Sequence, residues 1–187
     1  VRLWASVDWR SFQVVTTIAR PSETFFRTPL GPAMRPGAAV AAVGISLPER
    51  IVRNSEISTR LGVGDDWIER RTGIRERHVA GPDDRLDAHC ANAARIALER
   101  AGVLAAELDL VLVATTTPDE IMPNAAPLVA HLLGAERAGA FDVGSACTGF
   151  LAAIAVGSAQ IEAGRARSAV VIGADFESDH RVDLCAL

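Results

Sequence analysis

The chain has 187 residues, 49% hydrophobic and 22% charged, which fits one soluble globular domain with a sizeable core. Its net charge of −4 and pI near 5.6 argue against general nucleic-acid binding, which needs a basic surface. All 19 basic residues are arginines, which excludes a Gly-Lys-Ser/Thr phosphate loop and lysine Schiff-base chemistry within this sequence. Three widely spaced cysteines favour a reducing, cytoplasmic location over a disulfide framework or a zinc site.

Residues 1–33 differ from the rest of the chain. They hold five of the nine aromatic residues, lack steady hydrophobic periodicity and end in a stretch rich in Pro and Gly. We interpret them as an N-terminal extension, disordered or an artefact of start-site choice, that precedes a domain of residues 34–187. A targeting arm is the alternative, because arginines are set among apolar residues here, although Asp8 and Glu23 oppose it.

From Met34 onward, strand and helix patterns alternate. Strands are expected at residues 38–47, 75–80 (or an extended loop), 108–117, 138–143 and 168–176, and helices at 54–62, 65–73, 87–101, 124–133 and 147–163. The runs 108–117 and 168–176 are continuous and apolar, which is typical of strands buried on both faces. Helices between such strands predict parallel βαβ units with right-handed crossovers, and so an α/β fold.

The stretch from Gly144 to Ile161 contains no charged residue. A membrane span is the alternative that we reject, because the stretch contains polar residues and no basic cluster precedes it. A helix that is uncharged all round is instead expected to be buried all round. One open sheet covers only one face of a helix, so burial of the whole helix requires a second layer on its other side.

Cys147 lies between small residues at the expected start of this helix, directly after a strand. The unpaired N–H groups and the dipole of a helix N-terminus lower the pKa of a thiol there. They can also stabilise the oxyanion that forms when a thiolate attacks a thioester. Cys147 is therefore a candidate nucleophile. The alternative is a small buried hydrophobic side chain, as most free cysteines are, and position alone leaves both open.

A second constellation lies in DDWIERRTGIRERH, residues 65–78. Trp67 and Arg71 are four residues apart and so share a helix face. An indole and a guanidinium could sandwich a flat aromatic group such as adenine, and the arginine could also meet a phosphate. The alternative is a tryptophan that covers the edge of the core beside a solvated arginine face.

Three segments together resemble β-ketoacyl-acyl-carrier-protein synthase III, a condensing enzyme of the thiolase superfamily. They are DDWIERRTGIRERH (65–78), VLVATTTPD (111–119) and AFDVGSACTGF (140–150), and the similarity runs from about Arg35 to Asp175. The resemblance implies a thiolase-like fold of which this chain is the N-terminal half only. That half is one βαβαβ-type unit with a parallel-rich sheet and a central helix, after the nucleophile, buried between two halves.

The resemblance also implies roles for particular residues. Cys147 resembles the acylated nucleophile, and Trp67 and Arg71 resemble the pair that holds the adenine end of coenzyme A. Met122 stands where family members place a residue that crosses the dimer interface into the partner's acyl pocket, and Thr116 lies close to the same wall. The implied partners are acyl-CoA, acyl carrier protein and a second copy of the chain, with no nucleic acid, membrane, metal or tightly bound cofactor.

The implied activity is the decarboxylating Claisen condensation of acyl-CoA with malonyl-acyl carrier protein through a cysteine thioester. Full-length family members are nearly twice as long, and their catalytic His and Asn lie in the second half. We therefore expect the chain as written not to complete the condensation. Two alternatives stay open: a relative that transfers acyl groups to another acceptor in secondary metabolism, and an inactive fragment or non-catalytic pairing subunit.

Overall fold

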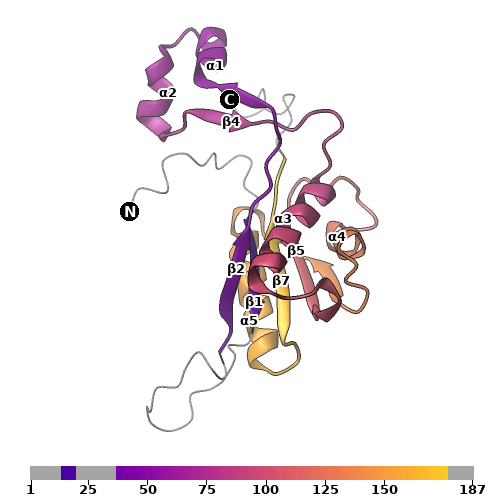
Figure 1. The fold of residues 1–187 in the computed structure, drawn as a ribbon. Helices are drawn as coiled ribbons and strands as arrows, with labels where there is room; N and C mark the ends of the chain where they lie inside the picture. The colour runs from indigo at the N-terminus through magenta and orange to yellow at the C-terminus, as the bar shows by residue number, and fades with distance from the viewer. Residues whose placement is uncertain (1–13, 20–36, 177–187) are drawn as a thin grey trace, which may run out of the picture.

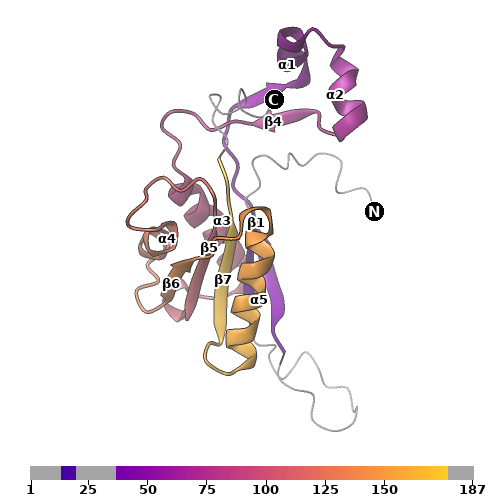
Figure 2. The same ribbon diagram turned by 180° about the vertical axis from the view of Figure 1, so that it is seen from behind.

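The computed structural model describes residues 14–19 and 37–176. Within them, a five-stranded sheet lies between two layers of helices, and a small unit of helices and strands extends beyond one end of the sheet (Figure 1). Helices α3 (Leu86–Ala101) and α4 (Ala125–Leu133) cover one face. Helix α5 (Gly149–Glu162) covers the other face, which Figure 2 shows from behind. The expected α/β fold is confirmed.

The sheet has the strand order β2-β1-β7-β5-β6. Its strands are β1 (Val14–Ala19), β2 (Ala39–Gly44), β5 (Leu110–Ala114), β6 (Gly139–Asp142) and β7 (Ser168–Gly173). Strand β5 lies parallel to both β6 and β7, as predicted, since α4 and α5 provide the crossovers that parallel strands need. Strand β1 runs antiparallel to β2 and β7, which makes the sheet mixed.

The apolar runs of β5 and β7 fill two cores because successive side chains of a strand point to opposite faces. Val111 and Val113 belong to the core beneath α3 and α4. Leu112 and Ala114 belong to the core beneath α5. Both faces of β5 are therefore buried, which explains why its sequence shows no alternation with polar residues.

Close packing of β2 against α3 depends on one glycine. A Cβ atom at Gly44 would overlap the carbonyl oxygen of Ala93 and lie 2.7 Å from the backbone nitrogen of Ala97. Four of the eight buried residues of α3 are alanine, so its backbone approaches the sheet closely. Only glycine fits at this point of β2.

The small unit contains β3 (Ile51–Arg53), α1 (Asn54–Leu61), α2 (Asp65–Thr72) and β4 (Glu76–His78), with β3 and β4 paired antiparallel. Both helices end where the sequence predicts, at glycines with φ of 66° for Gly62 and 73° for Gly73. The side chain of Asn54, buried at the start of α1, donates to the Ile74 carbonyl at 2.7 Å and accepts from Arg77 at 3.0 Å. These bonds tie α1 to the strand that leaves the unit.

Strand β1 corrects the expectation for residues 1–33. Residues 14–19 do not belong to a loose extension, because they form a strand between β2 and β7. Five of these six residues are β-branched, and such residues favour strands. The other residues of 1–33 lie outside the described ones, and the boundary at Met34 stays a prediction.

Helix α5 is buried on one face and not all round in the described part of the chain. Ala153, Gly157 and Ile161 face the sheet and are buried, whereas Leu151 is 66% exposed and Ala155 is exposed. This exposure has a simple cause: a single sheet can cover only one face of a helix. None of the helices formed by the described residues is long and apolar enough to cross a membrane.

Candidate functional site

The carboxyl ends of the parallel strands β5, β6 and β7 meet at one edge of the sheet. Two further backbone hydrogen bonds extend the pairing there, from Val143 to the Val113 carbonyl at 2.8 Å and from Ala174 to the Ala114 carbonyl at 3.0 Å. The segments that follow the strands, 115–117, 144–148 and 174–176, therefore lie at this edge. Ligands of open α/β sheets bind at this kind of edge.

Cys147 lies in a short 3₁₀ turn, Ala146–Thr148, that leads directly into α5. Its side chain is exposed. Thr148 closes the turn, because its backbone N–H and its hydroxyl both donate to the Ser145 carbonyl, at 3.1 and 2.9 Å. The structure thus places Cys147 at the start of the helix, as predicted, and not in the core as an inert thiol.

The other described cysteine has the opposite environment. Cys90 lies in α3 with no exposed surface. Burial, followed by nearby carboxylates, raises the pKa of the Cys90 thiol far above its ordinary value. A thiol that stays protonated and buried is not a nucleophile, so Cys147 is the reactive candidate of the two.

The turn before Cys147 is strained. Ala146 has a φ of 42°, in the left-handed region that favours glycine. An alanine there costs about 1–2 kcal/mol relative to a right-handed conformation. Such a conformation persists only where the surroundings hold it, and it is typical of functional turns.

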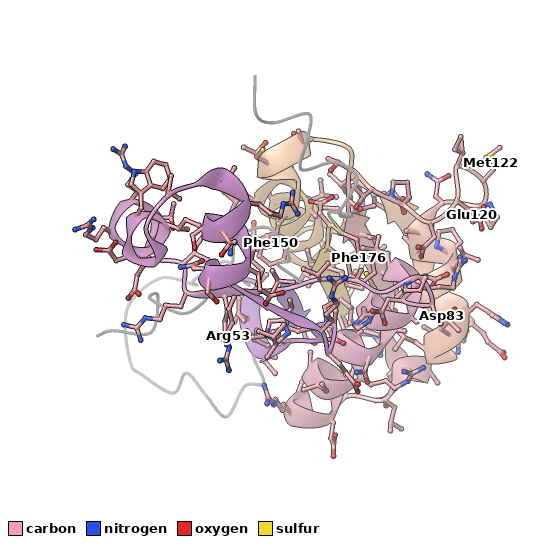
Figure 3. The ribbon with its side chains drawn as sticks, turned by 90° about the horizontal axis from the view of Figure 1, so that it is seen from above. Arg53, Asp83, Glu120, Met122, Phe150 and Phe176 are labelled. Carbon is pink, nitrogen blue, oxygen red and sulfur yellow. The ribbon has the colours of Figure 1, made fainter. Side chains whose placement is uncertain are left out.

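Small residues bring the start of α5 onto the end of β5. Gly149 is buried, and a Cβ atom there would lie 3.1 Å from the Ala114 Cβ. On β7, a Cβ at Gly173 would lie 3.0 Å from Phe150, which occupies the middle of the molecule in Figure 3. Gly149, two residues after Cys147, therefore lets the start of α5 pack directly on the end of β5.

Thr116, the predicted acyl-wall residue, follows β5 at the same edge. Its backbone N–H and its hydroxyl each donate to Asp175 Oδ1, both at 2.7 Å. The hydroxyls of Thr115 and Thr117 lie 3.4 and 3.5 Å from the same oxygen. Asp175 thus organises the whole threonine run. Asp175 was not predicted as a functional residue, because it falls inside the expected strand 168–176 and its partners lie 58 to 60 residues away in the chain.

Met122 lies farther along the segment that leaves this edge from the end of β5. It lies on the loop between β5 and α4 and is 81% exposed, next to Ile121, which is 91% exposed. Figure 3 shows Met122 at the outer side of the molecule, away from Phe150. The loop ends at α4, where Asp142 accepts hydrogen bonds from the backbone of Ala125 and Ala126 at 3.1 and 2.7 Å.

Trp67 and Arg71 lie together on α2, in the unit beyond the sheet (Figure 1). The Arg71 guanidinium carbon is 4.6 Å from the centre of the Trp67 ring, and Trp67 is 41% exposed. The predicted shared face is observed. A flat group between the two would need about 7 Å, twice a contact distance of about 3.5 Å. In this arrangement a ring can stack only on an outer face of the pair, and a sandwich requires Arg71 to move.

A polar cluster surrounds the His89 side chain. His89 of α3 is 2.9 Å from the Ser46 hydroxyl through Nδ1 and 3.3 Å from Asp84 through Nε2. Its ring meets Phe176 edge to face, with centroids 5.3 Å apart. A hydrogen bond from the Gly81 backbone, and then His89, hold the pKa of Asp84 below its usual value. The cluster joins the end of β2, α3 and the segment that follows β7.

Comparisons with known proteins identify the family of the chain. Residues 141–184 match the family model for 3-oxoacyl-[acyl-carrier-protein] synthase III. The β-ketoacyl-[acyl-carrier-protein] synthase III of Anaplasma marginale (strain St. Maries) is 44% identical over 136 residues, which are 73% of this chain and 42% of that protein.

Two solved structures share the fold. 3-Oxoacyl-[acyl-carrier-protein] synthase III from Aquifex aeolicus VF5 superimposes with a TM-score of 0.69 at 36% identity, over 72% of this chain and 44% of that one. The priming β-ketosynthase of the R1128 polyketide biosynthetic pathway does so with a TM-score of 0.67 at 40% identity, over 74% of this chain and 42% of that one.

The layered fold, with the Cys147 turn between β6 and α5, is therefore thiolase-like. More specifically, the chain belongs to the β-ketoacyl-[acyl-carrier-protein] synthase III family, as the three sequence segments predict. It spans less than half of the length of the curated relatives that it matches.

Proposed function

We propose that Cys147 accepts an acyl group from acyl-CoA, as the first step of a decarboxylating condensation with malonyl-acyl carrier protein. One observation carries the proposal: an exposed cysteine stands in a strained turn at the start of a helix, at the carboxyl edge of parallel strands. The family relationship supports it, because the proteins that the chain matches are named as synthases acting with acyl carrier protein.

The first step transfers the acyl group between two thiols. The Cys147 thiolate attacks the thioester carbonyl, and a carbon–sulfur bond forms as the carbonyl oxygen becomes an oxyanion. Backbone N–H groups of the turn at the start of α5 stabilise that charge. The oxyanion collapses, the bond to coenzyme A breaks, and the departing thiolate takes up a proton.

Trp67 and Arg71 hold the coenzyme A end of the donor in this proposal. The outer face of the indole offers a stacking surface for adenine, and the guanidinium offers charge and hydrogen bonds to phosphate. No metal or tightly bound cofactor takes part, and coenzyme A enters as substrate.

In the second step a malonyl thioester loses CO₂, and the resulting carbanion attacks the acyl group on Cys147. The cysteine thiolate leaves, and the product is a 3-oxoacyl thioester on the carrier protein. The resemblance assigns this step a His and an Asn from the second half of full-length members. In a cytoplasmic homodimer, Met122 would reach the partner's acyl pocket and Thr116 would lie near its wall.

A second candidate function is acyl transfer to another acceptor in secondary metabolism. The similarity to the priming β-ketosynthase of a polyketide pathway, at 40% identity, supports the part of this candidate that concerns secondary metabolism. Turnover with an alcohol or amine acceptor, and none with malonyl-acyl carrier protein, would identify this activity.

The release of free coenzyme A tests the proposal. Mixed with acetyl-, butyryl- or octanoyl-CoA, the chain should release up to one equivalent of coenzyme A in a burst. Cys147→Ala should abolish the burst, and the matched control Cys90→Ala should keep it, because Cys90 is buried in α3. Absence of a burst with every acyl-CoA would contradict acyl transfer and favour a non-catalytic pairing role.

A further inference from the structure

Arg85 joins the start of α3 to the loop that carries Met122. Its Nη2 lies 3.3 Å from Asp87 Oδ2, 3.8 Å from Asp119 Oδ2 and 3.6 Å from Glu120 Oε1. Asp87 belongs to the first turn of α3, whereas Asp119 and Glu120 belong to the loop. One guanidinium therefore holds carboxylates from two segments that are far apart in sequence.

We call the cluster of Arg85, Asp87, Asp119 and Glu120 the clamp. A backbone contact reinforces it. Asp119 Oδ2 also accepts a hydrogen bond from the backbone N–H of Asp87 at 2.9 Å. The inner members are shielded, with side chains 11% exposed for Asp87 and 17% for Asp119, while Arg85 and Glu120 are about half exposed. Shielding from water strengthens the inner contacts relative to a fully solvated ion pair.

The clamp ends next to the most exposed apolar residues of the loop. Ile121 and Met122 follow Glu120 directly, and Figure 3 shows Glu120 and Met122 on the same side of the molecule. Asp175 fixes the start of the loop through Thr116, and Asp142 fixes the start of α4 beyond its end. Arg85 acts on the part of the loop that lies between these two anchors.

We infer that Arg85 is a positioning residue that sets the place of Met122 and thereby the range of acyl chains that the synthase accepts. The inference rests on the proposed function for its effect on selectivity, but the clamp itself is a property of this chain. A pocket wall that is held in one place discriminates between chain lengths better than one that moves, because little ordering remains to be done on binding.

The structural half of the inference can be measured on Met122 directly. The chain contains two methionines, so methyl-¹³C methionine labelling gives two signals, and Met122→Leu assigns the one from Met122. Arg85→Gln should shift and sharpen the Met122 signal while leaving the Met34 signal unchanged. Arg85→Lys, which keeps a positive charge within reach, should restore most of the original signal.

Two further variants keep the measurement interpretable. Glu120→Gln removes one loop carboxylate and should move the Met122 signal in the same direction as Arg85→Gln. Arg95→Gln is the matched control, because Arg95 is another α3 arginine, whose guanidinium donates to the Leu132 carbonyl at 2.9 Å. A Met122 signal that Arg85→Gln and Glu120→Gln both leave in place would overturn the clamp.

The functional half uses acyl-CoA of different chain lengths. In Arg85→Gln, the ratio of coenzyme A release from octanoyl-CoA to that from acetyl-CoA should change about threefold, the size of effect that an exposed ion pair can have. Arg85→Lys should recover the ratio, and Arg95→Gln should not alter it. An unchanged ratio despite a shifted Met122 signal overturns the selectivity role. No release from the unmutated chain refutes the proposed function itself, while the methionine signals still decide the clamp.

Discussion

At the scale of single residues, the two described cysteines differ in their access to solvent. Cys90 and Cys147 are both free, but one is buried in α3 and the other is exposed in a helix-start turn. Since burial raises the pKa of Cys90, its thiol stays protonated at mildly alkaline pH.

This difference predicts selective alkylation. Iodoacetamide at mildly alkaline pH should modify Cys147 in the folded chain and should reach Cys90 only after unfolding in urea. Peptide mass spectrometry resolves the two sites, and labelling in urea is the control for intrinsic reactivity. Labelling of Cys90 as fast as Cys147 without denaturant would mean that α3 is not packed as described.

Backbone strain at Ala146 predicts an unusual response to glycine. Ala146→Gly relieves a left-handed conformation that costs about 1–2 kcal/mol, and this offsets the entropy of a freer unfolded chain, about 0.5–1 kcal/mol. The free energy of unfolding in urea should therefore stay the same or rise by up to about 1.5 kcal/mol. Ala155→Gly, at an exposed position inside α5, should instead lower it by about 1 kcal/mol. Equal losses in both variants would show that Ala146 is not strained.

The residues found from sequence are those with a local signal. Cys147 between small residues and the four-residue spacing of Trp67 and Arg71 are both visible in a short window. The anchors Asp175 and Arg85 were missed because their partners lie at least thirty residues away in the chain, apart from Asp87. A long-range contact leaves no trace in local spacing.

At the scale of elements, the fit of α5 against β5 controls where Cys147 lies. Gly149→Ala should slow acyl transfer, because its Cβ would lie 3.1 Å from Ala114 and push the start of α5 off the sheet. Gly157→Ala is the matched control in the same helix, since its nearest contact would be an ordinary 3.4 Å and alanine favours the helix by about 1 kcal/mol. Gly149→Ala should lower both the rate of coenzyme A release and the free energy of unfolding in urea, and Gly157→Ala should lower neither. Equal rates would contradict this account of the turn.

Helices and buried strands were predictable, and short or non-local strands were not. Four helices are capped by glycines, Gly62, Gly73, Gly102 and Gly134, at or next to the ends of the helix ranges that the sequence predicts. Strand β3 has only three residues, too few for a periodic pattern. Strand β1 was missed because its stability comes from pairing with β2 and β7, which a local pattern does not reveal.

At the scale of the whole molecule, α5 has one face on the sheet and one apolar face open in the described residues. The uncharged sequence of the helix predicted a need for cover on both sides. Which face of α5 the described residues cover could not be predicted from the sequence, because no charged residue in the helix marks a solvent-facing side.

The open face of α5 predicts that alanine substitutions on its two sides differ in their effect on the free energy of unfolding. Leu151→Ala should change the free energy of unfolding by no more than about 0.5 kcal/mol, because Leu151 is 66% exposed. Ile161→Ala should cost about 2–5 kcal/mol, because Ile161 is fully buried against the sheet. Urea unfolding measures both. A loss at Leu151 as large as that at Ile161 would show that the outer face of α5 is covered in solution.

The central claim is that Cys147 carries the acyl group, and mass spectrometry of the acylated chain tests it most directly. After incubation with acetyl-CoA and butyryl-CoA, the intact chain should gain the mass of one acyl group, and peptide mapping should place it on Cys147. Hydroxylamine should remove it, as it cleaves thioesters, and Cys147→Ala should gain nothing. An adduct that maps to another residue, or no adduct with either donor, would contradict the assignment of Cys147 as the nucleophile.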